Sequence, residues 1–179
     1  MSNYQHIFQP LKIGNIAAKN RIESSPAQPF LGSKDGLVTR EFIEWTRSMA
    51  KGGAGIVTVG DSPVTKEYAA ESAYVINLAD DKVVSGLYAL TEMIHRYGAL
   101  ASIELNLRTH DKPADMTREL MKAVIGDFVS AAYRCKIAGM DMVMIHGGHG
   151  HLIGNFFSPH YNLRTDEYGT QSLENRSRF

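Results

Sequence analysis

Residues 138–179, AGMDMVMIHGGHGHLIGNFFSPHYNLRTDEYGTQSLENRSRF, decide the fold class. They begin with a short apolar run, residues 140–145, in which Asp141 is the only charged residue. A histidine- and glycine-rich cluster follows, and then a polar loop rich in Asn, Asp and Arg. A buried strand that leads into a long polar loop is typical of α/β proteins, which present their sites at the carboxyl ends of parallel strands.

Three histidines, His146, His149 and His151, follow this predicted strand at once. The glycines between them leave room around the imidazoles and allow the backbone to turn sharply. Imidazoles concentrated at the end of one strand indicate a site, and we expect a planar or polar ligand to bind there.

The rest of the chain repeats the alternation of strand and helix. Besides residues 140–145, buried strands are predicted near Arg21–Ser25, at Gly55–Val59 and at Ala99–Leu105. The segments between them have helical apolar spacing and end at glycines. The expected N-caps of these helices are Thr39, Asp80 or Asp81, and Thr117, and Ser172 is expected to cap a further helix.

Gly14-Asn15 predicts an N-terminal hairpin, and residues 27–36, 61–77 and 106–115 are expected to be irregular. Strict alternation favours a parallel sheet with right-handed crossovers. A strand and its helix together occupy roughly 35–40 residues, which suits a (β/α) barrel or a doubly wound sheet. Because no G-x-G-x-x-G follows the first strand, the barrel is favoured. We therefore predict an α/β fold in which residues 1–179 form one partial domain, the N-terminal half of a (β/α)8 TIM barrel with a hairpin cap.

Composition restricts the function. Lys plus Arg and Asp plus Glu both number 19, and such a neutral chain gives no support for binding nucleic acid or an anionic membrane. The single cysteine, Cys135, excludes an internal disulfide and fits a reducing compartment. No apolar run approaches the ~20 residues of a membrane span. We expect a cytoplasmic protein without nucleic-acid or membrane partners.

Three separated motifs resemble the old yellow enzyme family of flavin-dependent ene-reductases, in particular its NADH:flavin oxidoreductase and dienoyl-CoA-reductase branch. The motifs are IFQPLKIGNIAAKNRIESSP at residues 7–26, DGLVTREFIEWTRSMAKGGAGIVTVG at 35–60, and residues 138–179. Together they cover most of the chain, and the last is long and specific. The resemblance implies a (β/α)8 barrel that holds FMN at the carboxyl ends of its strands, with NADH or NADPH as reductant and an α,β-unsaturated carbonyl or enoyl compound as substrate.

The same resemblance implies roles for individual residues. His146 and His149 match the pair that holds the carbonyl oxygen of the substrate, and His151 stands where the family usually has a proton-donating tyrosine. The positions that match flavin contacts are Ser25, Pro26, Ala27, Gln28, Gly60, Asp61 and Glu104. These residue types suit the chemistry, because reduction of an activated C=C needs a hydride, stabilisation of the developing enolate charge and a proton.

The chain departs from the family pattern at several points. Glu104 replaces a glutamine, so an acceptor stands where the family has both a donor and an acceptor. His151 replaces a tyrosine, and since an unperturbed imidazole has a pKa of ~6.5, proton donation is expected to depend more strongly on pH. Leu107 stands where relatives often have a histidine, and the connection from Asn106 to Met116 is shorter than usual.

Two other functions remain open from the sequence. His146, His149 and His151 with Asp166 could bind the metal ion of a hydrolase. Alternatively, the chain is a non-catalytic fragment, because the later strands of a barrel are absent from it. Half a barrel has open strand edges, so we expect the chain to associate with itself or with a missing C-terminal half. The loop from Arg164 to Tyr168 is either a salt-bridged connector or part of the site.

Overall fold

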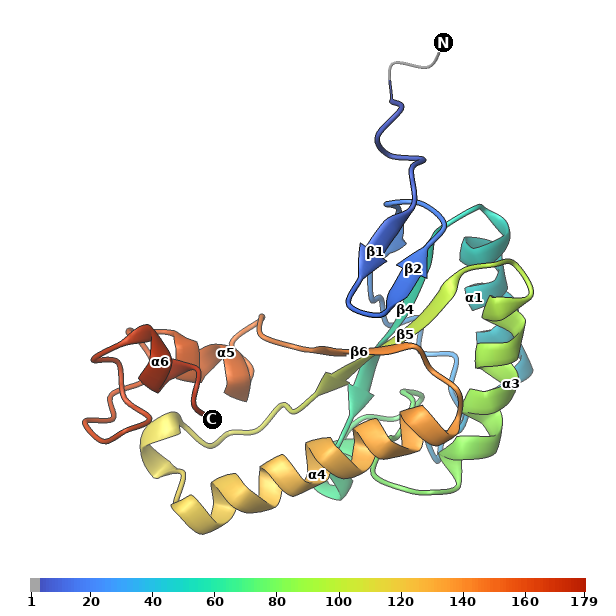
Figure 1. The fold of residues 1–179 in the computed structure, drawn as a ribbon. Helices are drawn as coiled ribbons and strands as arrows, with labels where there is room; N and C mark the ends of the chain where they lie inside the picture. The colour runs from blue at the N-terminus through green and yellow to red at the C-terminus, as the bar shows by residue number, and fades with distance from the viewer. Residues whose placement is uncertain (1–3) are drawn as a thin grey trace.

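The computed structural model describes residues 4–179, and it contains two separate sheets (Figure 1). The smaller sheet is an antiparallel hairpin of β1 (Leu11–Ile13) and β2 (Ile16–Ala18). Gly14 turns the chain between them at a φ of 56°, a left-handed conformation that glycine adopts without steric cost. The predicted N-terminal hairpin is thus confirmed.

The main sheet has four parallel strands in sequential order: β3 (Glu23–Ser24), β4 (Ile56–Pro63), β5 (Leu100–Asn106) and β6 (Met142–Ile145). The crossover helices α1 (Arg40–Lys51), α3 (Val83–His95) and α4 (Arg118–Ile137) lie between successive strands in the chain. Figure 1 shows α1 and α3 side by side along the sheet, and α3 also contacts α4. This order of parallel strands and helices confirms the predicted α/β half-barrel.

The two faces of β5 differ in chemistry because successive side chains of a strand point to opposite faces. Ala101, Ile103 and Leu105 are almost fully buried in the core formed with the helices. Ser102, Glu104 and Asn106 alternate with them and are also buried. The strand therefore carries an apolar face toward the helices and a polar face on the other side of the sheet.

Three of the predicted helix starts are confirmed by side-chain caps. The hydroxyls of Thr39 and Thr117 each accept a backbone N–H three residues later at 3.1 Å, and that of Ser172 does so at 3.0 Å for α6 (Leu173–Arg176). The cap expected for α3 is wrong, since its N-cap is Lys82, which makes no capping bond. Asp80 instead accepts the N–H of Lys82 at 2.9 Å, in the turn before the helix.

Regular structure extends into segments that were expected to be irregular. β4 continues four residues beyond Val59 through a register shift against β5. The short helices α2 (Lys66–Ala70) and α5 (Leu152–Phe157) and the 3₁₀ turn η1 (Pro113–Asp115) were not predicted. They escape sequence patterns because each has six residues or fewer, too few to show helical periodicity.

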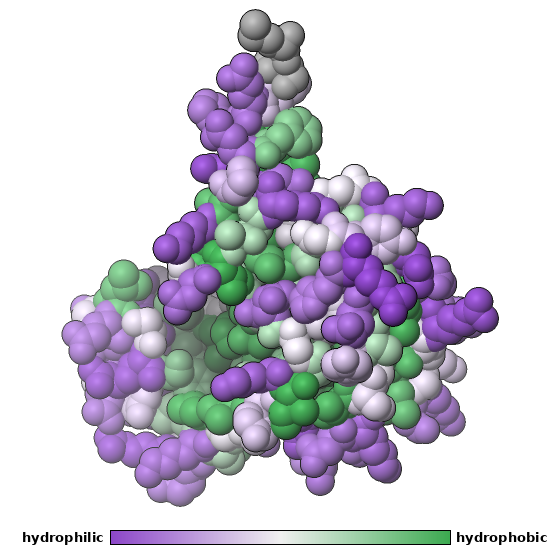
Figure 2. Space-filling model, turned by 45° about the vertical axis from the view of Figure 1, so that its right-hand side comes forward, coloured by the Kyte–Doolittle hydropathy of each residue, from purple (hydrophilic) through white to green (hydrophobic). Residues whose placement is uncertain are grey.

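The C-terminal segment, residues 146–179 with α5 and α6, projects away from the sheet (Figure 1). A space-filling view shows a hollow between this segment and the rest of the molecule, with apolar residues in it (Figure 2). Exposed apolar side chains also follow α4 and β6. We call this set the open face; its members are Ile125, Val129, Tyr133, Ile137, Val143 and Ile145, each 40–63% exposed.

Within residues 4–179, no helix is both long enough and apolar enough to cross a membrane.

The open face predicts that the chain associates in solution. Apolar area of this kind on a soluble domain is usually covered by a partner. We expect the average mass in sedimentation velocity to rise with protein concentration, and Val129→Lys/Tyr133→Lys to lower that rise. Ser130→Lys, which adds a charge at an exposed polar position of the same helix, serves as the control. A wild-type chain that stays monomeric at every concentration would contradict the prediction.

Candidate functional site

Every predicted site residue lies at or just beyond the carboxyl end of a strand of the main sheet. Ser25–Gln28 follow β3, Gly60 and Asp61 lie in the last half of β4, and Glu104 lies near the end of β5. The histidine cluster follows β6 directly. Since these strands are parallel, all four groups meet at one edge of the sheet, and hydrogen bonds connect them into two networks.

The first network is centred on the Asp61 carboxylate. Oδ1 accepts the Nδ2–H of Asn106 at 2.6 Å, and Oδ2 accepts the hydroxyl of Tyr68. The backbone carbonyl of Asp61 accepts the side-chain amide of Gln28 at 3.0 Å. Burial, followed by the hydrogen bond to Asp61, raises the pKa of Tyr68, so this hydroxyl remains a donor at neutral pH. Gln28 and Asn106, 33 and 45 residues away in the sequence, and the nearby helix α2 are thereby fixed to the end of β4.

The hydrogen bond to Asp61 fixes which way the Asn106 amide faces, and Asn106 in turn orients the ring of His151. Because a carboxylate only accepts, the amide nitrogen of Asn106 must face Asp61, and its oxygen then faces Nδ1 of His151 at 2.8 Å. Nδ1 of His151 therefore carries a proton. Burial, followed by the charge of His146, lowers the pKa of His151 below its ordinary value of 6.5. At neutral pH its other nitrogen, Nε2, consequently has a free lone pair.

The second network joins Glu104, His146 and His149. Oε1 of Glu104 lies 2.7 Å from Nδ1 of His146, and Nε2 of His146 lies 3.0 Å from Nδ1 of His149. The rings of His146 and His149 are stacked, with centroids 4.9 Å apart and planes 8° apart. The ring of His151 also lies 4.9 Å from that of His146. The three predicted histidines thus form one cluster.

Gly60 is closely surrounded where the two networks meet. A Cβ at this position would lie 2.7 Å from the Cβ of Pro26 and 2.8 Å from Oε2 of Glu104. These separations are shorter than side chains tolerate. Any larger residue would therefore push apart the loop after β3 and the end of β5.

The arrangement counts against the metal-dependent alternative. In the described part of the chain, no group of three His, Cys, Asp or Glu side chains is arranged to hold a metal ion. Both ring nitrogens of His146 are engaged by protein groups, and Asp166 lies in a separate ion pair with Arg164. The histidines cluster through hydrogen bonds and stacking and do not converge on one point.

Comparison with known proteins assigns this arrangement to a family. The model of the NADH:flavin oxidoreductase / NADH oxidase family matches residues 6–115 and 106–179. The chain belongs to this family.

Individual relatives agree with the assignment. An NADPH dehydrogenase of Listeria monocytogenes serotype 4b (strain F2365) is 34% identical over 184 residues, covering 91% of this chain and 54% of that protein. An NADH oxidase of Thermoanaerobacter brockii is 30% identical over 203 residues, covering all of this chain and 31% of that protein. The crystal structure of Old Yellow Enzyme from Pichia sp. AKU4542 superposes with a TM-score of 0.84 at 25% identity, covering 97% of this chain and 53% of that one. The chain thus spans about half, or less, of the length of these proteins.

The connection after β5 is where the two matches to the NADH:flavin oxidoreductase family model meet. The two matched stretches overlap at residues 106–115, within this connection. The alignment with the NADH oxidase extends over 203 positions, against 179 residues in the chain, so that relative has residues that this chain lacks. A cavity of about 530 Å³ lies here, between α2, residues 107–111 and α4. Tyr68 and Leu152 line it, which places it beside the Asp61 network.

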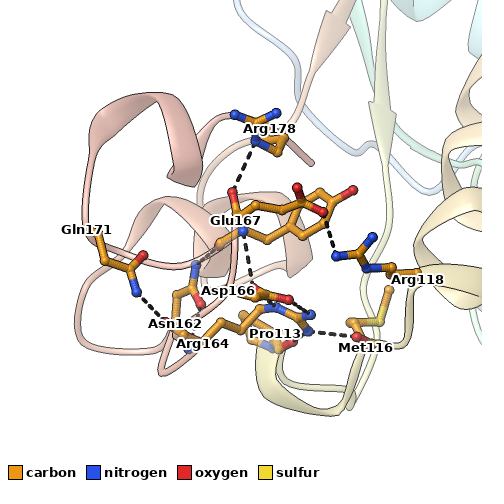
Figure 3. Close-up of polar contacts among 10 residues, drawn as sticks. Pro113, Met116, Arg118, Asn162, Arg164, Asp166, Glu167, Gln171 and Arg178 are labelled. Carbon is orange, nitrogen blue, oxygen red and sulfur yellow. Dashed lines mark hydrogen bonds and ion pairs between the residues drawn. The ribbon is translucent and has the colours of Figure 1, made fainter.

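Arg164 fastens the C-terminal segment to this connection (Figure 3). Its Nη1 donates to the carbonyl oxygens of Pro113 and Met116, both at 2.7 Å, and its Nε and Nη2 donate to the two carboxylate oxygens of Asp166. Asn162 adds to these contacts by donating to the carbonyls of Phe156 and Tyr168. We call the hydrogen bonds made by Arg164 and Asn162 the clamp. Of the two expectations for residues 164–168, the structure supports the salt-bridged connector.

Three residues of the site were missed from the sequence: Tyr68, Asn106 and Arg108, whose guanidinium lies 5.3 Å from the centre of the Tyr68 ring. Tyr68 and Arg108 lie in segments without periodicity, so no pattern marks them. Asn106 had a usable signal, because it is a polar residue at the end of an apolar strand, two positions after Glu104 and therefore on the same face.

The clamp yields a stability prediction that depends on pH. Asp166→Asn should lower the free energy of unfolding at pH 7 by about 1–2 kcal/mol, around the lower end of the range for hydrogen bonds to charged groups, because Asp166 is partly exposed. The hydrogen bonds from Arg164 lower the pKa of Asp166 below 3.8. The stabilisation is therefore fully present above pH 3.8 and is lost as the pH falls through the lower, folded-state pKa.

Chemical denaturation across this pH range measures the effect. Glu174→Gln is the matched control, since it removes a carboxylate that pairs with Arg178 but is 82% exposed, and it should cost less than about 0.5 kcal/mol. Equal losses in the two variants at pH 7 would contradict the role of the clamp.

Proposed function

We propose that the chain is the FMN-binding part of an oxidoreductase of the ene-reductase type. Hydride passes from NADH or NADPH through FMN to the C=C of an α,β-unsaturated carbonyl or enoyl substrate. The observation that carries this proposal is that the histidine cluster, Ser25–Gln28 and Gly60 all lie at the carboxyl end of one parallel sheet. Family membership supports the flavin, and the cluster supplies groups suited to a substrate oxygen and a proton.

The residues proposed to hold FMN divide into two groups. Ser25 and Ala27 are exposed on the loop after β3 and are accessible to a ligand. Gln28, Asp61 and Glu104 already bond to protein groups, so they are better suited to shaping the cradle. Pro26 and Gly60 complete it, and no room for a Cβ remains at Gly60 between Pro26 and Glu104. The exposed loop is proposed to receive the planar cofactor, and FMN bound there would supply the hydride.

His146 and His149 are proposed to hold the carbonyl oxygen of the substrate. Their facing nitrogens are hydrogen-bonded to each other at 3.0 Å, so when this bond opens both can turn to the same oxygen. Hydrogen bonds to this oxygen stabilise the negative charge that it gains as the alkene accepts hydride. Asn106 fixes the orientation of His151 in the same cluster. His151 is proposed to deliver the proton to the alkene carbon that does not receive the hydride.

The relatives are longer than this chain, and this difference suggests what could cover its open face. A complete (β/α)8 barrel has further strands and helices beyond β6. The open face lies where the next of these elements would pack. We propose that this face is covered either by a C-terminal half or by a second copy of the chain. We further propose that the protein acts in the cytoplasm on a small molecule.

The flavin proposal predicts a visible absorption band. The purified 179-residue chain, incubated with FMN and then freed of excess, should keep the band in roughly equimolar amount. Gly60→Val should abolish retention, because its side chain would collide with Pro26 and Glu104. Gly126→Ala is the control, since a Cβ at that position of α4 meets open space. A folded wild-type chain that retains no flavin would instead favour a non-catalytic fragment.

The proton-donor proposal predicts a pH profile. With Nδ1 of His151 bonded to Asn106, Nε2 carries a proton only in the cationic form. Because the pKa of His151 is lowered below 6.5, reoxidation of the reduced protein by 2-cyclohexenone should accelerate as the pH falls through and below 6.5. In His151→Tyr the donor keeps its proton up to about pH 10, so the part of the pH dependence that comes from the donor should be lost. Stopped-flow traces of flavin absorbance from pH 5 to 8.5 measure both, and a flat wild-type profile would contradict the role of His151.

A further inference from the structure

Glu104 makes its shortest contact with His146. The side chains of Glu104 and His146 are both only 10% exposed, and their facing atoms are 2.7 Å apart. Since a carboxylate can only accept a hydrogen bond, Nδ1 of His146 must carry a proton. Glu104 therefore decides which nitrogen of His146 is protonated, a choice that the imidazole does not make by itself.

This choice continues through the pair. With its proton on Nδ1, a neutral His146 has a lone pair on Nε2, and this lone pair faces Nδ1 of His149 at 3.0 Å. Nδ1 of His149 must then be the donor, and Nε2 of His149 has a lone pair as well. In their neutral forms, the two imidazoles direct both of their N–H groups at protein acceptors. Neither has an N–H available for a ligand oxygen.

We propose that Glu104 is the positioning residue and counter-ion of His146, and that the pair takes up one proton before both imidazoles donate to a ligand oxygen. The proton comes from solvent and enters at Nε2 of His146, which breaks the bond to His149. His146 is then an imidazolium between Glu104 and the ligand, and His149 is free to donate its Nδ1–H to the same oxygen. The inference rests on the proposed function for the nature of that oxygen, a substrate carbonyl.

The surroundings leave this role to Glu104. His151 is the other imidazole beside His146, and its Nδ1 donates to Asn106. The Asp61 carboxylate receives Asn106 and Tyr68, and Arg108 lies over the Tyr68 ring. Of these groups, only Glu104 accepts a hydrogen bond directly from His146. A glutamine at position 104 could also accept the Nδ1–H but would carry no charge to balance an imidazolium.

The protonation of each histidine nitrogen can be read by long-range ¹H–¹⁵N correlation NMR. We would label the full chain with ¹⁵N-histidine, assign His146 by loss of its signals in His146→Ala, and record spectra at pH 8.5. The wild type should show His146 protonated at Nδ1 with a lone pair at Nε2. Glu104→Gln should keep this form, and Glu104→Met should lose it to the form protonated at Nε2. Glu67→Met, at an exposed position on α2, is the control and should match the wild type.

Acidification tests the second step. In the wild type, Nε2 of His146 should gain its proton while Nδ1 keeps its own, and this doubly protonated form should require more acid in Glu104→Gln. Wild-type His146 protonated at Nε2 at pH 8.5, or an unchanged form in Glu104→Met with dispersed backbone signals, would overturn the proposal. The readout uses neither FMN nor turnover, so failure of flavin binding and failure of this inference are separate results.

Discussion

The parallel register of β4, β5 and β6 is the constraint on which the site depends. The register places Val57 opposite Ala101 and Ser102 opposite Met142, so the strands run side by side and end at one edge. The helices anchor this register by burying one face of β5, and a slip of one residue would exchange its apolar and polar faces. The same packing that stabilises the fold therefore aims Glu104 and Asn106 away from the helices.

The carboxylates of the polar edge are stable because neighbouring side chains donate hydrogen bonds to them. Asp61 receives hydrogen bonds from Tyr68 and Asn106, and Glu104 receives one from His146. A buried carboxylate without such donors would cost several kcal/mol. Each bond also orients the group beyond it, so the two carboxylates position imidazoles that belong to a segment more than forty residues away. The hydrogen bonds that satisfy the buried carboxylates therefore also orient the histidines.

Much of the fold could be predicted because its signals are local. Thr39, Thr117 and Ser172 cap helices through their own neighbours, and the apolar run at residues 140–145 supplies a strand of the parallel sheet, as predicted. The predicted burial of this strand is wrong for Val143 and Ile145, which belong to the open face, because burial depends on which elements pack over the strand. The prediction of the α3 cap failed because Asp80 accepts the N–H of Lys82 in the preceding turn and does not cap the helix. The sequence does not show which of two nearby N–H groups such a side chain will choose. The short helix α2 owes its place to Tyr68, which is buried against β4 and bonded to Asp61.

For the site, the sequence could predict which residues lie near one another but not which atoms form hydrogen bonds. Parallel strands bring their ends together, so Glu104 and the histidines could be expected at one edge, but the partner of each nitrogen depends on side-chain geometry. Sequence reasoning placed Glu104 at the flavin on the strength of the glutamine it replaces. In the structure its carboxylate faces His146, a contact that spans 42 residues and that no pattern encodes.

Two departures from the family pattern are connected through β5. Glu104 and Asn106 are two residues apart on the same face of the strand, and each accepts the Nδ1–H of one imidazole, His146 and His151 respectively. A histidine in place of a tyrosine adds a choice of tautomer that a phenol does not have, and a neighbour must settle that choice. Asn106 does so for His151, with its own orientation fixed by Asp61. The end of β5 therefore sets the protonation pattern of the cluster, and any change there alters which nitrogens can donate.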